Sequence, residues 1–437
     1  METSRLKGFH KLSREERLDR VALLADLGRD EAQSLVLGGM DLDLADQMIE
    51  NVVGRLGLPL GVGVNLTVNG RDRLVVMVIE EPSVVAGMSH AAKLMRGEGG
   101  IRVDLDPPIM IAQIQVLDVP DAEKAAAAVQ AAKAELLAHA NGLDPLLVRV
   151  GGGALDMEVR HLVPLETGAD GDDALADPLG PMLVVHLLVD VRDAMGANAV
   201  NTMAEGLAPS IEKLTGGRVR LRILSNLADR RLVRASGSVP VDDLEGHGMT
   251  GRDVAEGIVE ASVFAERDPY RAATHNKGIM NGVDAVLLAT GQDFRAVEAG
   301  AHAYAARSGR YRALSRWRIE GDRLVGRLEM PMAVGTVGGV VKVHPTVRAA
   351  LRVMEVLKAA DLAELAASAG LAQNLAALRA LAAEGIQSGH MRLHARNLAV
   401  AAGASAEEVD LVIQEMVNSA SMTAAGAASI LERLRAK

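Results

Sequence analysis

The chain has 437 residues and contains no cysteine. Disulfide bonds, thiolate nucleophiles, cysteine-ligated zinc and iron–sulfur clusters are therefore excluded. Aromatic residues make up only 2% of the sequence, so the core must be aliphatic and the stacking surfaces that bind single-stranded nucleic acid are lacking. No apolar run approaches the roughly 18 residues of a membrane span, and the N-terminus has no segment of signal-peptide type.

Acidic residues outnumber basic ones, 57 to 47, and the formal net charge is −10. Such a chain lacks the positive footprint of a nucleic-acid-binding protein. Hydrophobic residues make up 49% of the sequence, enough for a large core, and the length suggests about three compact units. We expect a cytoplasmic, multi-domain enzyme or binding protein that contacts neither nucleic acid nor membrane.

The pattern along the chain predicts an α+β protein. Ser13 and Glu16 form a capping box ahead of an N-terminal helix. Residues 62–68 and 74–79 flank an Asn-Gly turn and predict a β-hairpin. From residue 345 onward the pattern is helical, and Gly370 is among the glycines that are expected to interrupt it.

Residues 109–225 read as β-α-β-β-α-β, which predicts a ferredoxin-like (split βαβ) unit inserted into a larger domain. Within it, residues 146–150 are expected to be a strand and residues 197–215 a helix. The predicted domains are a discontinuous large domain, 1–108 and 226–384, a small domain, 109–225, and a C-terminal helical flap, 385–437.

An unusual polar cluster occupies residues 268–282, between apolar segments. Glycine and methionine are dispersed among its polar residues, which favours a packed, shaped turn over a solvated loop. Burial would lower the pKa of Lys277, whereas a neighbouring carboxylate would restore its ammonium form. Asp293 is a candidate for that carboxylate.

Glu80 and Glu81 end an apolar strand, where adjacent side chains point in opposite directions, so only one can face a cleft. That glutamate either stabilises the start of the following helix or serves as an acid with a raised pKa. His390 and His394 lie four residues apart but lack the Glu of a His-Glu-x-x-His zinc motif, so we expect no metal site. His390 remains a candidate proton donor.

Residues 190–202 follow a buried strand and open a helix, where backbone amides either hold a phosphate or make an ordinary turn. The spacing is not Gly-x-Gly-x-x-Gly, so a Rossmann fold is unsupported. Asp156 follows a triple glycine, which is either a plain hairpin or a way to place a carboxylate near a ribose 2′-hydroxyl and favour NAD. Arg160, on the predicted strand that follows, would instead accommodate the phosphate of NADP.

Together these residues suit the reduction of a carbonyl group by a dinucleotide. Two other functions remain open: a Schiff-base lyase that uses Lys277 as its nucleophile, and a non-enzymatic helical binding protein.

The ordered motifs of the whole chain resemble a known family. They are Glu50–Gly54, Glu80–Ser83, His186 ahead of Asp193–Asn198, Thr274–Asn281, Ala289–Asp293 and Gly389–Met391. This pattern is similar to that of class II (bacterial-type) hydroxymethylglutaryl-CoA reductases. Val340 with Val341, and Ser388, depart from the family pattern in the Gly-rich loop and the flap.

The resemblance implies interconversion of hydroxymethylglutaryl-CoA (HMG-CoA) with mevalonate and CoA through two hydride transfers. It implies NAD as cofactor, with NADP as the alternative, and a homodimer that shares its sites between subunits. The residues implied to be catalytic are Glu81 as proton donor, Lys277 as the cation at the carbonyl oxygen, Asp293 between them, and His390 as the acid for the CoA thiolate. Those implied to bind the cofactor are Asp156, Asp193, Met195, Gly196 and Asn198, and those implied to bind the substrate are Ser83, Arg271, Thr274 and Asn281.

Overall fold

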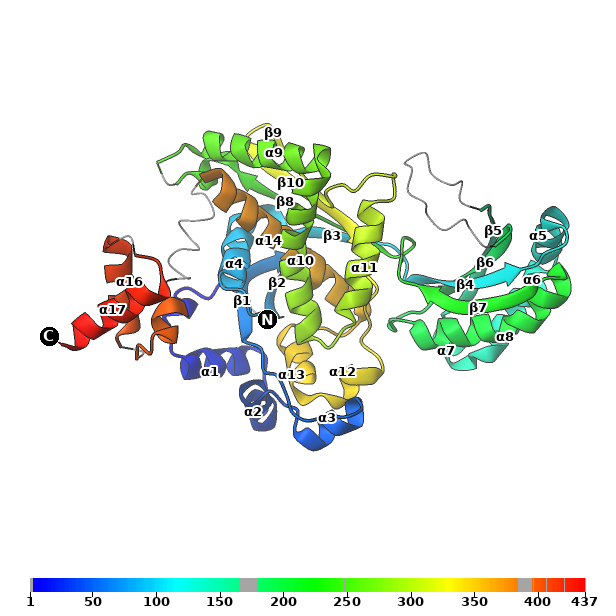
Figure 1. The fold of residues 1–437 in the computed structure, drawn as a ribbon, viewed down its shortest axis with the longest axis horizontal. Helices are drawn as coiled ribbons and strands as arrows, with labels where there is room; N and C mark the ends of the chain where they lie inside the picture. The colour runs from blue at the N-terminus through cyan, green and yellow to red at the C-terminus, as the bar shows by residue number, and fades with distance from the viewer. Residues whose placement is uncertain are drawn as a thin grey trace.

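The computed structural model describes residues 3–164, 179–246, 248–383, 395, 397–405, 407–419 and 421–436. Its buried apolar residues form three separate clusters: one large core, one in a sheet-containing lobe and one among the C-terminal helices. Figure 1 shows the lobe and the C-terminal helices on opposite sides of the main body. Mixed helix and sheet throughout agrees with the predicted α+β class.

The N-terminal region is helical, as predicted. It contains η1 (Phe9–Lys11), α1 (Arg14–Leu24), α2 (Arg29–Leu37) and α3 (Leu42–Met48). Both bonds of the predicted capping box are present, since Glu16 N donates to Ser13 Oγ over 3.1 Å and Ser13 N to Glu16 Oε2 over 2.7 Å.

The main body contains the predicted hairpin, β1 (Leu60–Val68) and β2 (Arg71–Val78), followed by α4 (Val84–Leu94). An antiparallel sheet has the order β3 (Arg102–Leu105), β8 (Leu232–Pro240), β10 (Arg323–Pro331) and β9 (Ser315–Glu320). The helices of this body are α9 (Gly251–Arg267), α10 (Pro269–Ala289), α11 (Phe294–Ala305), α12 (Gly339–Val343), α13 (Pro345–Val353) and α14 (Ala359–Ala383), with short turns η2 (Gly97–Gly99) and η3 (Val241–Leu244).

The expectation of a packed turn at residues 268–282 is wrong, because this stretch forms most of α10. Asp268 caps the helix by accepting a hydrogen bond from Tyr270 N, and Pro269 occupies the first helical position. An acidic cap followed by proline is a common helix start, since proline there loses no hydrogen bond. The polar residues of the cluster therefore belong to a helix face.

Gly370 was expected to interrupt the C-terminal helices, but it lies inside α14 and is buried. A Cβ atom on Gly370 would lie 2.7 Å from Val283 Cγ2, and one on Gly282 would lie 2.6 Å from the Ala369 carbonyl oxygen. The two glycines thus permit α10 and α14 to pack backbone to backbone. Glycine here serves close packing rather than helix termination.

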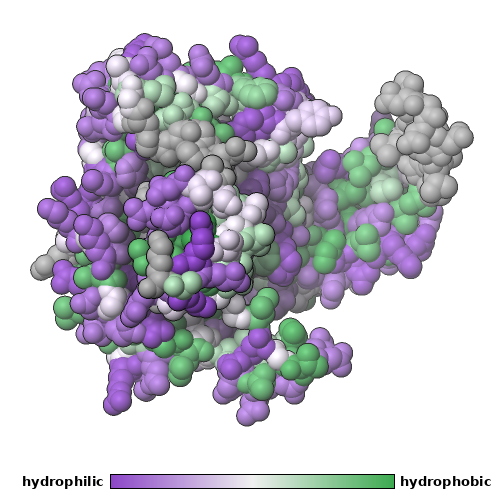
Figure 2. All heavy atoms as spheres, turned by 60° about the vertical axis from the view of Figure 1, so that its left-hand side comes forward, coloured by the Kyte–Doolittle hydropathy of each residue, from purple (hydrophilic) through white to green (hydrophobic). Residues whose placement is uncertain are grey.

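The second lobe is built on a sheet in the order β5 (Gly153–Leu162), β6 (Met182–Asp190), β4 (Ile109–Leu117) and β7 (Arg218–Ser225), with antiparallel neighbours. This is the strand order of the predicted split βαβ arrangement. Its helices are α5 (Ala122–Ala131), α6 (Lys133–Leu143), α7 (Pro145–Arg149) and α8 (Ala197–Thr215). Figure 2 shows the lobe projecting from the main body.

The predicted strand at residues 146–150 is wrong, because these residues form the short helix α7. The Asp144 side chain accepts a hydrogen bond from Leu147 N over 2.9 Å, and Pro145 is the first helical residue. These start signals prevail over the β-favouring Leu-Leu-Val sequence.

The C-terminal helices include α16 (Val409–Asn418) and α17 (Ala424–Arg435), which share a small apolar core with Ala395 and Ala399. Within the ranges described, none of the helices has the length and apolar character needed to cross a membrane.

Candidate active site

A lysine and a glutamate meet where α10 passes the end of the β1–β2 hairpin. Lys277 Nζ lies 2.6 Å from Glu81 Oε2, and Asn281 Nδ2 donates to the same oxygen over 3.2 Å. The Lys277 side chain is 61% exposed and that of Glu81 is 32% exposed, so the pair faces an open surface. The two helix residues are four apart, which places them on one face of α10.

Other residues that were predicted to bind substrate lie on α10 and at the start of α4, close in sequence to Lys277 and Glu81. Thr274 is exposed on α10, about one turn before Lys277, and Arg271 is half-buried one turn earlier. Burial lowers the pKa of Arg271 from its ordinary value. Ser83 begins α4 with a left-handed backbone, φ 73°, and its side chain makes no capping bond, which leaves its hydroxyl available.

Asp293 is not brought to Lys277 within this chain. It caps α11, with Oδ1 accepting from Ala296 N over 3.1 Å, and it pairs with Arg295 over 3.0 Å. Twelve helical residues separate Lys277 from Ala289, a rise of about 18 Å along α10. The predicted contact of Asp293 with Lys277 is therefore not one that a single subunit makes.

The loop before α8 has the backbone form that a phosphate site requires. Gly196 has φ 106°, and a Cβ atom there would lie 2.6 Å from Val191 Cγ1. The α8 helix has 19 residues, and its first amides are free of helical partners, with Asn198 exposed beside them. The arrangement fits the phosphates of a dinucleotide.

Asp193 in this loop is engaged with the main body. Its Oδ1 accepts from Ala359 N, the first residue of α14, over 2.9 Å, and its carbonyl oxygen accepts from Thr336 N over 2.8 Å. Arg231, which sequence reasoning missed, is buried and donates to the carbonyls of Ala194 over 3.2 Å and Val334 over 2.6 Å. Asp193 and Arg231 thus tie the loop to the main body.

Met195 is fixed in the same way, because its carbonyl oxygen lies 3.4 Å from Arg231 Nη1. Burial lowers the pKa of Arg231 to about 10, which leaves the guanidinium charged at neutral pH. Nothing in the local sequence marked this arginine, because its partners are backbone carbonyls from distant segments.

Asp156 on β5 forms an ion pair with Lys133, the first residue of α6. The hydrogen bond from Lys133, followed by that from Met157 N, lowers the pKa of Asp156. Lys133 was not among the predicted residues. Because Lys133 adds a positive charge beside the Asp156 carboxylate, the pair offers an acceptor for a ribose hydroxyl and a cation for a ribose phosphate.

A second pair of acidic residues went unnoticed in the sequence. Asp284 lies on the same face of α10 as Lys277, two turns further on, and interacts with Glu298 of α11. Burial, and then the neighbouring Glu298, raise the pKa of Asp284 to about 8. This carboxyl group is therefore mainly protonated at neutral pH.

His390 and His394 lie outside the described residues. Among the residues that are described, no three histidine or carboxylate side chains gather in the manner of a metal site.

Comparison with known proteins identifies the family. Residues 14–395 match the family model described as hydroxymethylglutaryl-coenzyme A reductase. The chain belongs to this family. It is 50% identical over 434 residues to the 3-hydroxy-3-methylglutaryl-coenzyme A reductase of Archaeoglobus fulgidus, covering 99% of this chain and 95% of that protein. A probable reductase of Borreliella burgdorferi is 33% identical over 82% of this chain and 78% of its own length.

Solved structures agree. The reductase of Streptococcus pneumoniae superposes with a TM-score of 0.80 at 41% identity, covering 98% of this chain and 99% of that one. A structure described as the class II reductase from the same organism, bound to NADPH in open conformations, has a TM-score of 0.79 at 42% identity and covers 86% of this chain and 99% of that one. The class II resemblance drawn from the motifs is confirmed, and neither the lyase nor the binding-protein alternative is favoured.

Proposed function

We propose that this hydroxymethylglutaryl-CoA reductase performs its chemistry at the Lys277–Glu81 pair and uses NAD(H). The observation that carries the site is the 2.6 Å contact between an ammonium and a carboxylate from elements far apart in the sequence. The two groups have complementary tasks in carbonyl reduction. A fixed cation stabilises negative charge on oxygen, and an adjacent acid supplies the proton.

The protein's own residues would act as follows. Lys277 holds the carbonyl oxygen of the thioester, and later that of the aldehyde, as each gains charge. Glu81, after taking up a proton from solvent, gives it to the aldehyde oxygen, which yields the alcohol of mevalonate. His390 protonates the departing CoA thiolate, so that a thiol leaves instead of an anion. The bound dinucleotide supplies the two hydrides.

A large cavity supports the placement of the acyl-CoA. It has a volume of about 1100 Å³ and is lined along α4 from Val85 and Ala86, just after Glu81, to Lys93. The stretch of helix from Val85 to Lys93 spans about 12 Å. Apolar residues of the N-terminal segment and of β1 form its walls, and its cationic side chains are Arg5, Lys7, Arg14, Arg17 and Lys93. An apolar cavity with these cations, and Glu15, in its wall suits a long thioester arm that carries phosphates.

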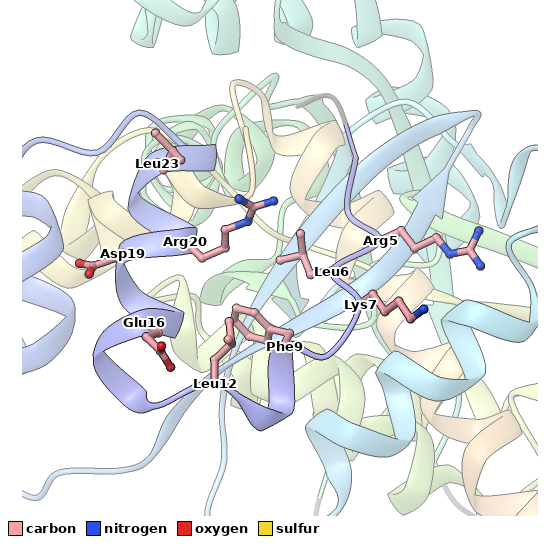
Figure 3. Close-up of a pocket in the computed structure, with 9 residues that line it drawn as sticks. All are labelled: Arg5, Leu6, Lys7, Phe9, Leu12, Glu16, Asp19, Arg20 and Leu23. Carbon is pink, nitrogen blue, oxygen red and sulfur yellow. The ribbon is translucent and has the colours of Figure 1, made fainter.

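A second hollow adjoins the first, and the two share Arg5, Leu6, Lys7 and Phe9. Figure 3 shows Leu6, Phe9 and Leu12 in its centre. The heads of Arg5 and Lys7 lie on one side of these apolar residues, and Glu16 and Asp19 lie on the other. Arg20 also lines this hollow, so its wall carries both positive and negative side chains.

Asp293 enters the proposal through a second copy of the chain. Since about 18 Å of helix separates Lys277 from Ala289, and Asp293 lies beyond Ala289 as the cap of α11, we assign the partner's carboxylate to this role. The site is then complete only in a dimer, in which each subunit contributes Lys277 to one site and Asp293 to the other. This agrees with the shared sites that the resemblance implies.

NAD is proposed because Asp156 supplies a carboxylate of the kind that binds a ribose 2′-hydroxyl. The neighbouring Lys133 lessens that preference, and a solved relative binds NADPH. NADP is therefore retained as the second cofactor.

The deciding experiment is an assay of the purified chain with HMG-CoA and NADH. We expect NADH oxidation that depends on HMG-CoA, and NAD⁺ reduction when mevalonate and CoA are supplied. Silence in both directions, with each dinucleotide, would refute the proposal. Borohydride treatment in the presence of substrate should leave the chain unlabelled, because a covalent adduct would instead indicate Schiff-base chemistry.

A further inference from the structure

Two consecutive side chains of α10, immediately before Lys277, point into the protein. His275 is 2% exposed and Asn276 is fully buried, whereas Lys277 is largely exposed. Successive helical residues turn by about 100°, so two inward residues leave the next one facing outward. The contacts of His275 and Asn276 therefore decide which way Lys277 faces.

The Asn276 amide is fully used. Its Nδ2 donates to Tyr311 Oη over 3.0 Å and to the Arg312 carbonyl oxygen over 2.9 Å. Its Oδ1 accepts from Leu314 N over 2.9 Å. Both amide hydrogens and the oxygen thus bind residues 311–314, the segment that leads into β9.

His275 belongs to a buried hydrogen-bonded network. Trp317 Nε1 can only donate, and it lies 2.7 Å from Asn374 Oδ1, so the orientation of that amide is settled. Ser315 Oγ lies 2.8 Å from the same oxygen and gives it its single proton. His275 Nε2 lies 2.6 Å from Ser315 Oγ and 3.3 Å from Asn374 Nδ2, so both side chains hold the ring.

The buried His275 ring is neutral at pH 7. Burial, and then the charge of Arg271, lower its pKa to about 3, which agrees with this form. Its Nδ1 atom is buried and lacks a hydrogen-bond partner in the described part of the chain. An unsatisfied buried group costs on the order of 1–3 kcal/mol, so stability alone does not explain an imidazole at this position.

The distances show why helix rotation matters. The outer surface of a helix lies about 5–6 Å from its axis, so a rotation of roughly 20° moves an outward group by about 2 Å. A displacement of 1 Å can lower the rate of an enzyme by about a hundredfold. The hydrogen bonds of Lys277 in the described structure go only to Glu81, so they do little to resist such a rotation.

We propose that His275 and Asn276 are positioning residues that fix the rotation of α10 and so hold the Lys277 ammonium against Glu81. They act through the segment 311–315 and through Asn374 of α14. The inference rests on the proposed role of Lys277.

The test compares three variants with the wild-type enzyme. His275→Phe fills the space but removes the hydrogen bond, and His275→Gln keeps a donor near the position of Nε2. Ile279→Val, on the buried side of α10, is the matched control, because it destabilises the helix packing by about 1 kcal/mol and removes no hydrogen bond.

We expect His275→Phe to lower kcat at least tenfold with the KM for the dinucleotide within twofold, and His275→Gln to recover most of the loss. Ile279→Val should keep kcat within twofold despite its lower Tm. Full kcat in His275→Phe, or a kcat that merely follows Tm across the three variants, would overturn the proposal. If His275→Phe does not fold, Ser315→Ala, which removes the hydroxyl that contacts both His275 and Asn374, is judged by the same criteria.

Lys277→Met separates this inference from the proposed function. If Lys277→Met is active, the role of the lysine itself fails. If Lys277→Met is inactive while His275→Phe keeps full kcat, only the positioning role fails.

Discussion

Lys277 of α10 and Glu81, which follows β2, form an ion pair of 2.6 Å although 196 residues separate them in the sequence. Both groups are partly exposed, so the pair contributes little to stability. We therefore expect the ion pair to serve the reaction, so that substitutions of either residue should lower turnover far more than stability.

Lys277→Met should lower kcat by at least a hundredfold, because one electrostatic partner of a developing oxyanion is worth about 3 kcal/mol. The Tm should stay within about 2 °C, since the side chain is 61% exposed. Steady-state assay of NADH oxidation and a thermal melt measure the two effects. Lys124→Met, on an exposed turn of α5, is the control. A Lys277→Met enzyme within tenfold of wild type would contradict the proposed role.

Mixed dimers test whether Asp293 acts across subunits. Asp293→Asn keeps an acceptor for the α11 cap and should be nearly inactive alone, as should Lys277→Met. When the two inactive chains are mixed and allowed to exchange, half of the dimers are mixed and each has one intact site. About a quarter of wild-type activity should return. No recovery, with exchange shown by mass spectrometry, would place both residues in one subunit.

The pair of Asp156 and Lys133 should set the preference between dinucleotides. Lys133→Ala should lower kcat/KM for NADPH relative to NADH by about tenfold, because it removes a cation that can face the 2′-phosphate. Asp156→Ala should change the ratio in the opposite direction. Lys124→Ala is the control for the loss of a positive charge, because Lys124 pairs with Asp121, the residue that caps α5. An unchanged ratio in both variants would remove these residues from the cofactor site.

Lys93 should contribute to binding of the CoA end of the substrate. It lines the cavity of about 1100 Å³ at the far end of α4 from Glu81. Lys93→Ala should raise the KM for HMG-CoA by about threefold to tenfold and leave that for the dinucleotide unchanged, because a charged contact to phosphate is lost. Lys213→Ala, near the end of α8, is the control. Equal changes in both KM values would argue against this placement.

Asp284 should make stability fall as the pH rises. Its pKa is about 8 in the folded protein against an ordinary value of 3.8, so the folded state keeps a proton that the unfolded chain releases. Stability from this group is full below about pH 4 and is lost as the pH rises toward 8. The Tm of Asp284→Asn should therefore exceed that of wild type increasingly from pH 5 to pH 8. Glu205→Gln, on the exposed side of α8, should show a constant difference.

Local signals predicted the capping box at Ser13, the hairpin ending near Glu81 and the helix after Gly196, because each depends on neighbouring residues alone. The motifs also selected Lys277 and Glu81 as a pair. The prediction of a turn at residues 268–282 was wrong because polar residues that lie on one face of a helix look like loop residues when the helical spacing is overlooked. The prediction for Gly370 was wrong because glycine occurs both where helices end and where two helices pack closely together.

Other parts of the site depend on contacts that the sequence does not encode locally. Arg231 binds carbonyl groups, which every residue has, so no pattern of side chains marks its partners. The Asp284–Glu298 pair joins two helices whose packing had to be known first. Asp293 was predicted to lie beside Lys277, and its separation from Lys277 within one chain emerges only once α10 is seen as one long helix.

α14 is one uninterrupted helix that contacts both the loop before α8 and the buried residues next to Lys277. Ala359 N at its start binds Asp193 of the loop before α8, and Asn374, about 22 Å further along, belongs to the buried network of His275. No hinge lies between these points to absorb movement. A displacement of that loop must therefore either break the hydrogen bond to Ala359 or move α14 as a whole, and with it the network that contacts His275.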